Sequence, residues 1–172
     1  MRKSYEKFVD YIQKNGWQFC INEHENLKLN REITSRYSNI CEEYLEFLRC
    51  FEKVVTPDQT AWFLCVPDYE EISESEDKFC FNEFEQISLD VAEGDSEWTQ
   101  EITNFWDKTF PIILSTSYGY YSYYAIDLTD NSCKIVYGEE PEFEETEVVA
   151  DCFEEFLGMI MRGEIVLGES DD

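Results

Sequence analysis

Apolar and polar positions alternate most clearly in the last third of the chain. Residues 120–128 are aromatic and β-branched, a composition typical of strands, and both faces of such a strand would carry apolar side chains. The polar residues 129–132 are typical of a turn, and residues 134–137 return as a second strand before Gly138. The pattern therefore predicts a β-hairpin whose first strand lies inside a sheet rather than at its edge.

Helical spacing follows this hairpin. Five apolar residues fall on one face at a period of about 3.6: Val149, Phe153, Phe156, Leu157 and Ile160. Thr146 stands where an N-cap belongs, and Gly163 provides a stop. We expect one amphipathic helix between these two residues.

The same spacing predicts four helices upstream. Their ranges are residues 5–15, about 40–51, 79–93, and from Ser96 onward. Ser4 would cap the first, and Asn39 with Glu42 would form a capping box for the second. The apolar face of the last would carry Trp98, Ile102, Phe105 and Trp106.

Shorter apolar segments predict the remaining strands. Residues 17–21 alternate, residues 61–66 form a continuous apolar run that Pro67 ends, and residues 110–114 lead into the hairpin. Residues 22–37 lack a clean period and are expected as loop with helical turns. Without an internal repeat or a dividing linker, the chain predicts a single α+β domain over residues 1–172, with an acidic tail at 166–172.

Charge changes the picture most. The chain holds 39 acidic and 13 basic residues, for a net charge of −26, and the excess lies in two regions. Residues 68–107 contain 14 acids and one base, and residues 139–172 contain 13 acids and one base. Phosphate contacts need lysine and arginine, so direct nucleic-acid binding is disfavoured. Such a field favours a basic partner, although an acidic surface also serves solubility alone.

Residues that carry catalysis or bind metals are scarce. Phosphate-loop, nucleophile-elbow, dinucleotide and zinc-protease motifs are absent from the sequence, which has one histidine, His24. Seven scattered cysteines without a C-x-x-C pair favour buried, reduced thiols in a cytoplasmic protein. We therefore expect no catalytic residue, no cofactor and no metal. Apolar runs are shorter than the roughly 20 residues of a membrane span, and the first residues lack a secretory signal pattern.

Two segments together resemble a known family. Residues 40–48, ICEEYLEFL, resemble the L-P-x-x-Y-x-x-F-L helix of the SUKH superfamily, the Smi/Knr type, with Cys41 in place of the usual proline. The strand ending in residues 125–128, the acidic turn 138–141 and residues 149–157 are similar to the family's closing A-x-x-F-x-x-F-L helix. The resemblance covers about residues 5–165.

The resemblance implies a fold and a function. It implies helices flanking a mixed, mainly antiparallel sheet. It also implies a non-enzymatic immunity protein of a bacterial polymorphic toxin system, which binds a cognate toxin, often a nuclease. The fungal branch implies an alternative, a scaffold or regulator of cell-wall synthesis that acts through protein contacts. We expect a cytoplasmic protein, a monomer or weak homodimer, whose acidic surface meets a basic toxin and neither nucleic acid nor membrane.

Candidate partner-binding residues follow from the acidic segments and the tyrosine-rich strand. The predicted set is Asp68, Tyr69, Glu70, Glu71, Glu74, Tyr121, Tyr123, Glu139, Glu140 and Glu142. For each acid the alternative is a solvated surface position, and for each tyrosine it is core packing. An enzyme that uses a carboxylate pair is a third, less favoured hypothesis, because 39 acids make many such pairs and none is diagnostic.

Overall fold

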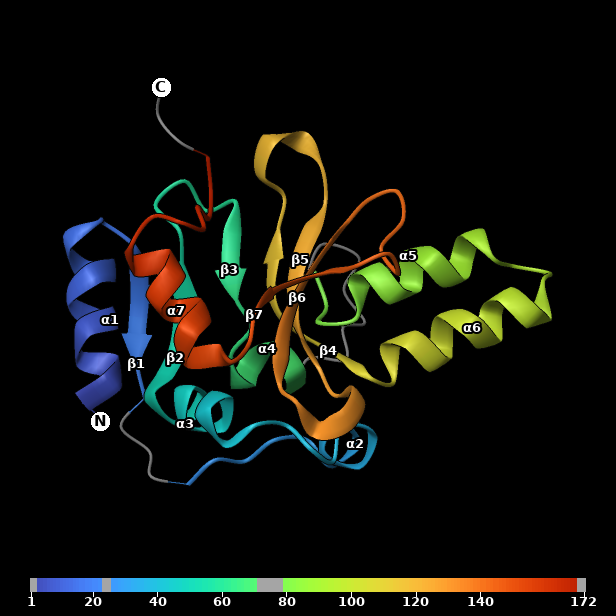
Figure 1. Ribbon diagram of the computed structural model, residues 1–172, viewed down its shortest axis with the longest axis horizontal. Coiled ribbons are helices and arrows are strands. Elements are labelled where there is room, and N and C mark those ends of the chain that lie inside the picture. The colour runs from blue at the N-terminus through green and yellow to red at the C-terminus, as the bar shows by residue number, and fades with distance from the viewer. Residues whose placement is uncertain (1–2, 23–25, 71–78, 170–172) are drawn as a thin grey trace.

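The chain folds around one seven-stranded sheet whose strands lie side by side in the order of the sequence (Figure 1). This computed structural model describes residues 3–22, 26–70 and 79–169. Each neighbouring pair of strands is antiparallel. The strands are β1 (Gln18–Ile21), β2 (Phe51–Val55), β3 (Ala61–Phe63), β4 (Thr109–Ser115), β5 (Ser122–Asp127), β6 (Lys134–Glu139) and β7 (Glu147–Ala150). The expectation of an α+β fold with a mainly antiparallel sheet is confirmed.

Helices cover both faces of the sheet. They are α1 (Lys3–Lys14), α2 (Arg31–Arg36), α3 (Glu42–Cys50), α4 (Val66–Glu70), α5 (Glu83–Val91), α6 (Ser96–Trp106) and α7 (Phe153–Met161). On β5, Tyr124 contacts Phe156 of α7 at 5.0 Å between ring centroids, and the adjacent Tyr123 contacts Phe84 of α5 at 5.9 Å. Neighbouring residues of a strand point to opposite faces, so α7 and α5 lie on opposite sides of the sheet.

An aromatic core joins α1, α3 and α7 to the sheet. Phe47 of α3 lies 5.0 Å from Phe63 of β3 and 5.4 Å from Phe153 of α7, and Phe8 of α1 lies 6.1 Å from Phe47, all between ring centroids. These side chains are fully or almost fully buried. Edge-to-face and tilted ring pairs of this kind add about 0.5–1.5 kcal/mol each beyond the area they bury.

Two buried tyrosines bind backbone carbonyls of the sheet region, one just after β3 and one within β4. The Tyr44 hydroxyl donates to the carbonyl of Leu64 at 2.6 Å, and the Tyr69 hydroxyl donates to the carbonyl of Pro111 at 2.7 Å. The two hydroxyl oxygens are 2.9 Å apart. A buried carbonyl without a donor is costly, so these bonds tie α3 to the end of β3 and α4 to the bulged part of β4.

Several expected elements are confirmed. The β5–β6 hairpin forms, with a short 3₁₀ turn at Thr129–Asn131, and β5 lies between β4 and β6 as a central strand. The helices expected from residues 5, 40, 79 and 96 are present with adjusted ends. Among the helices of the described residues, none has the length and apolar composition of a membrane span.

Several predicted element boundaries are wrong. Residues 147–150 form β7 and not the start of the last helix, which begins at Phe153 with Cys152 rather than Thr146 as its N-cap. Pairing with β6 decides this, because Ala150 and Val148 lie opposite Ile135 and Val136. Phe51 is the first residue of β2 and not the last residue of a helix. The helix before it, α3, begins after Cys41 and lacks the expected capping box of Asn39 and Glu42. Ser4 lies inside α1 instead of capping it.

Candidate protein-binding surface

Helices α5 and α6 pack side by side and extend away from the sheet as a helical hairpin (Figure 1). The turn between them contains Gly94 at φ +91°, a left-handed conformation that glycine adopts without strain. Asp95 then caps α6, because its carboxylate accepts hydrogen bonds from the backbone N–H groups of Glu97 at 3.1 Å and Trp98 at 3.0 Å. We call residues 83–107 the helical hairpin.

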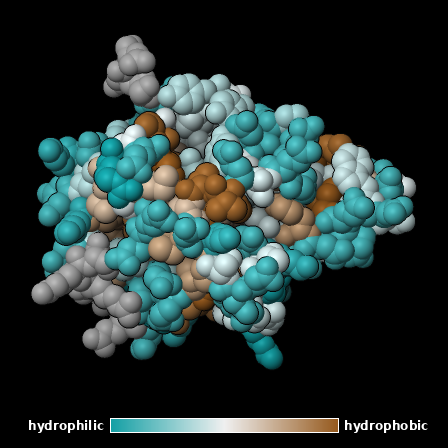
Figure 2. All heavy atoms as spheres, viewed as in Figure 1, coloured by the Kyte–Doolittle hydropathy of each residue, from teal (hydrophilic) through white to brown (hydrophobic). Residues whose placement is uncertain are grey.

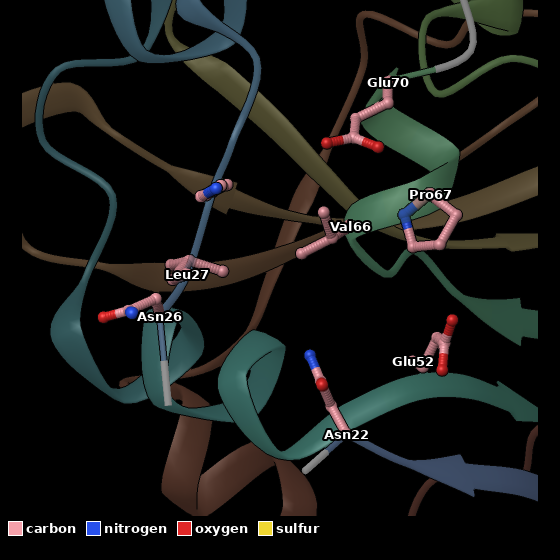
Figure 3. Close-up of a pocket in the computed structure, with 8 residues that line it drawn as sticks. Asn22, Asn26, Leu27, Glu52, Val66, Pro67 and Glu70 are labelled. Carbon is pink, nitrogen blue, oxygen red and sulfur yellow. The ribbon is translucent and has the colours of Figure 1, made fainter. Parts of the chain in front are cut away.

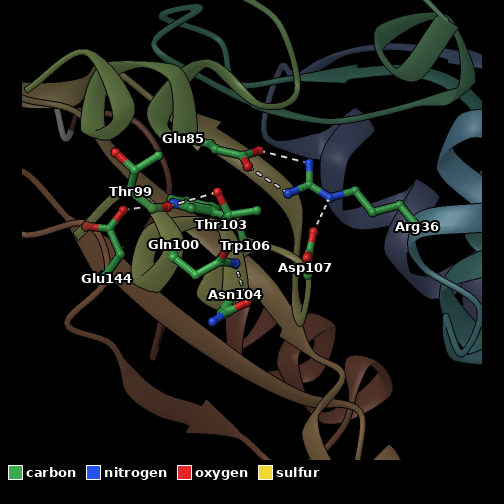
Figure 4. A network of polar contacts seen from close by, with 9 residues as sticks. All are labelled: Arg36, Glu85, Thr99, Gln100, Thr103, Asn104, Trp106, Asp107 and Glu144. Carbon is green, nitrogen blue, oxygen red and sulfur yellow. Dashed lines mark hydrogen bonds and ion pairs between the residues drawn. The ribbon is translucent and has the colours of Figure 1, made fainter. Parts of the chain in front are cut away.

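The base of the helical hairpin is fixed to the connection between β6 and β7. Phe84 stacks on Phe143 with ring centroids 4.7 Å apart and planes within 2°. The indole N–H of Trp106 donates to Glu144 at 2.8 Å (Figure 4). Both Phe84 and Trp106 are buried, so the hairpin base is part of the core while its far end is not.

An ion pair from α2 holds the same base (Figure 4). Arg36 donates two hydrogen bonds to the buried carboxylate of Glu85, at 2.9 and 2.7 Å, and a third to Asp107 at 2.8 Å. Burial by itself would lower the pKa of the Arg36 guanidinium, but the bonds and charges of Glu85 and Asp107 outweigh it and raise that pKa above its usual range. Arg36 therefore stays charged and neutralises two acids of the helical hairpin.

The rest of the hairpin surface is negative. Residues 83–107 contain eight acids and no lysine or arginine. Apart from Asp107, which pairs with Arg36, five of them are exposed: Asp90, Glu93, Asp95, Glu97 and Glu101. The adjoining residues 139–147 add six more acids and no base. We call residues 83–107 and 139–147 together the acidic unit.

Several of these acids oppose helix stability. Asp90 lies in the last turn of α5 and Glu93 directly follows the helix, where the helix dipole favours positive charge. Glu97 and Glu101 are four residues apart on α6, a like-charge spacing that costs about 0.2–0.5 kcal/mol. Asp95 and Glu97, by contrast, stand at the N-terminus of α6, where an acidic cap and negative charge are favourable. Helix stability therefore accounts for the acids at the start of α6 but not for Asp90 and Glu93.

Four of the predicted partner-binding residues belong to the acidic unit or touch it. Glu139 and Glu142 are exposed, and Glu140 accepts a hydrogen bond from the backbone N–H of Tyr121 at 2.9 Å. The half-buried Tyr121 ring stacks on Phe84 with centroids 5.6 Å apart. The structure thus brings residues 139–142 and Tyr121 together with the helical hairpin.

The other predicted residues lie elsewhere. Tyr69 is 1% exposed and Tyr123 is fully buried, so both are core residues and neither can be a surface anchor; that expectation is wrong for them. The Asp68 carboxylate accepts from the backbone N–H of Cys65 at 2.7 Å, which holds the start of α4. Glu70 is exposed on α4, while Glu71 and Glu74 lie outside the described residues.

Glu70 lines a separate pocket (Figure 3). The pocket has a volume of about 480 Å³ and is walled by residues of four segments: Asn22, Asn26, Leu27, Lys28, Glu52, Val66, Pro67 and Glu70. Its polar groups are two carboxylates, two amides and one amine, without a thiol, an imidazole or a hydroxyl. That set suits hydrogen bonding and offers no side-chain nucleophile of the serine, cysteine or histidine type.

The buried cysteines are protonated thiols of the core. Burial raises the pKa of the Cys41 thiol to about 12, so it stays protonated at neutral pH. Cys50 and Cys65 are also buried, whereas Cys20 is exposed, so burial of the thiols is only partly confirmed. Within residues 3–22, 26–70 and 79–169, no three histidine, cysteine or acidic side chains gather as a metal site would need.

Sequence reasoning missed the end of the helical hairpin. The acid run over residues 68–107 was visible in the sequence, but the candidate residues came only from its first, loop-like part. Trp98 was assigned to the apolar face of α6 and is 44% exposed. The available signal was the surplus of acids at the end of one helix and the start of the next.

Comparison with known proteins gives no relative. No protein-family model matches the chain, and neither the curated proteins nor the solved structures contain a significant match.

Proposed function

We propose that this protein is a non-enzymatic immunity protein that binds a basic protein toxin and blocks its active surface. The observation that carries the proposal is the acidic unit, in which exposed acids, among them Asp90 and Glu93 at the unfavourable end of α5, are displayed on an anchored helical hairpin. Surface acids that lower the stability of their own helix are best explained by binding to a partner. The segments that resemble the SUKH superfamily support the same function.

A basic toxin fits this surface by charge. A nuclease must present lysine and arginine to phosphate, and a rigid array of carboxylates can occupy those positions in place of the nucleic acid. Opposite charge can also raise association from about 10⁵–10⁶ to about 10⁸–10⁹ M⁻¹s⁻¹ at low salt. Fast association matters for an inhibitor that acts inside the cell which makes or receives the toxin, and we place the protein in the cytoplasm.

Co-expression tests the proposal. The product of the adjacent gene is expressed alone and together with this protein, growth is scored, and any complex is purified. We expect growth arrest alone, rescue by co-expression, and a one-to-one complex that weakens as salt rises. Arrest without rescue, or a complex whose affinity does not change with salt, would contradict the proposal. A harmless neighbour that binds weakly would favour the alternative, a scaffold or regulator that acts through protein contacts.

A further inference from the structure

Two large apolar side chains are exposed at the end of the helical hairpin. Val91, the last residue of α5, is 68% exposed, and Trp98, in the first turn of α6, is 44% exposed. The ends that carry them are in contact, since the Thr99 hydroxyl donates to the carbonyl of Ala92 at 3.4 Å. The space-filling view shows hydrophobic residues among hydrophilic ones over this part of the molecule (Figure 2).

Neither side chain belongs to the buried core of the helical hairpin. The buried positions of the helical hairpin are Phe84, Glu85, Ser88, Ala92, Ile102 and Trp106. Ala92 and Ile102 are each 1% exposed, whereas Val91 and Trp98 are among the large apolar side chains left exposed. An indole left half in water on a helix face is typical of a binding anchor, because tryptophan is the residue most enriched at interaction hot spots.

Carboxylates surround this apolar pair. Asp90 and Glu93 flank Val91 in the sequence, and Glu97 and Glu101 lie beside Trp98 on α6, all of them exposed. A second copy of the chain is a poor occupant, because it would bring like charges together around the contact. A segment whose apolar side chain is flanked by lysine or arginine complements the face, and arginine can in addition stack on the indole.

We propose that the end of the helical hairpin, Val91 and Trp98 with their four flanking acids, is the docking site for a basic amphipathic helix of a partner protein. This inference rests on the proposed function in so far as the toxin supplies that helix. The apolar face of the partner helix packs on Val91 and Trp98, and its lysines and arginines meet Asp90, Glu93, Glu97 and Glu101. Trp98 supplies most of the affinity, and the acids supply the association rate and the salt dependence.

Two synthetic peptides of equal length and equal charge test the site. One is an amphipathic helix of lysine and leucine, and the other has serine at each leucine position. Binding to the full chain is measured by fluorescence anisotropy of the labelled peptide at two salt concentrations. The leucine peptide is expected to bind about tenfold more tightly than the serine peptide, and Trp98→Ala is expected to abolish that difference.

Matched variants separate anchoring from folding. Trp98→Phe should keep most of the affinity, and Val166→Ala, which shortens a side chain that is 64% exposed on the C-terminal segment, should leave it unchanged. Circular dichroism checks that each variant is folded. Equal binding of both peptides to the native chain, or equal loss in Trp98→Ala and Val166→Ala, would overturn the proposal.

The two proposals fail in different ways. The peptide measurement contains no toxin, so its result tests the docking site whatever the neighbouring gene encodes. Failure of growth rescue together with a Trp98-dependent peptide complex would overturn the immunity function and support the site. Rescue that Trp98→Ala leaves intact, with a peptide complex that does not depend on Trp98, would support the function and overturn the site.

Discussion

Arg36 of α2 binds Glu85 of α5 through two parallel hydrogen bonds, at 2.9 and 2.7 Å, across 49 positions of the sequence. The Glu85 side chain is 5% exposed and the Arg36 side chain 25%. The pair therefore fixes the orientation of the helical hairpin, whose far end is proposed to meet the partner. Its loss is predicted to affect both stability and binding.

Arg36→Met leaves the Glu85 carboxylate buried without its cation. We expect the free energy of unfolding to fall by about 2–4 kcal/mol. Breaking a fully buried ion pair costs about 3–5 kcal/mol, and the expected loss is smaller because Arg36 is partly solvated. Urea denaturation measures it. The control is Arg49→Met, which breaks ion pairs of α3 with Glu42 and Glu46 near the surface and should cost about 0–1 kcal/mol. Equal losses in the two variants would contradict this account of the Arg36–Glu85 pair.

Gly138 and Gly158 are predicted to respond oppositely to alanine. A Cβ at Gly138 would lie 2.6 Å from the ring of the buried Tyr123, whose hydroxyl donates to the carbonyl of Phe143 and holds the ring in place. Gly138→Ala should destabilise by about 1–3 kcal/mol. A Cβ at Gly158 would lie 2.9 Å from the guanidinium of Arg162, at the exposed end of a long side chain that can shift together with its partner Glu164, so Gly158→Ala in α7 should stabilise by up to about 1 kcal/mol. The unfolding temperature of each variant, compared with that of the native chain, tests both predictions. A Gly138→Ala variant more stable than the native chain would show that the Tyr123 ring is free to move.

Asp58 is predicted to give a pH-dependent contribution to stability. Burial would raise its pKa, but hydrogen bonds from the Thr56 hydroxyl, from the backbone N–H of Glu169 and from Thr60 prevail and lower it to about 2. A lowered pKa means that the stabilisation is present above the unfolded-state value of about 3.9 and is lost as pH falls toward 2.

Comparison of the native chain with Asp58→Asn over pH 2–6 isolates this contribution. The difference in the free energy of unfolding should be largest above about pH 4 and should shrink as pH falls toward 2. Asp10→Asn, at an exposed position of α1, serves as the control and should show little change. A constant difference between native and Asp58→Asn proteins across the range would show that the Asp58 charge does not stabilise the fold.

Much of the fold could be predicted because its elements have regular periods. The β5–β6 hairpin and the helices α1, α3 and α6 follow from spacing alone. The sequence could not show that residues 147–150 are a strand, because Val149 is in helical phase with Phe153 and only pairing with β6 decides. It hid β2 for a related reason: α3 ends at Cys50 and β2 starts at Phe51 without a glycine or proline between them.

The candidate surface was harder to predict than the fold. Tyr69 and Tyr123 are of a residue type that often anchors interfaces, but their hydroxyls donate to backbone carbonyls inside the core. A sequence alone cannot reveal those bonds. Trp98 has the spacing of a core residue, but its side chain is 44% exposed. Burial depends on which elements pack together in space. The apolar period therefore predicted the helix α6 correctly but placed Trp98 wrongly on its buried face.

The most direct test of the central claim is the association rate with the toxin that the rescue experiment identifies. The native chain is compared with two variants that remove equal charge. One carries Asp90→Asn, Glu93→Gln, Glu97→Gln and Glu101→Gln in the helical hairpin, and the other carries Glu6→Gln, Asp10→Asn, Glu43→Gln and Glu154→Gln at exposed positions elsewhere. We expect the hairpin variant to associate about tenfold or more slowly at low salt with a weaker salt dependence, and the second variant to stay near the native rate. Equal slowing in both variants, or none in either, would contradict binding through the acidic unit.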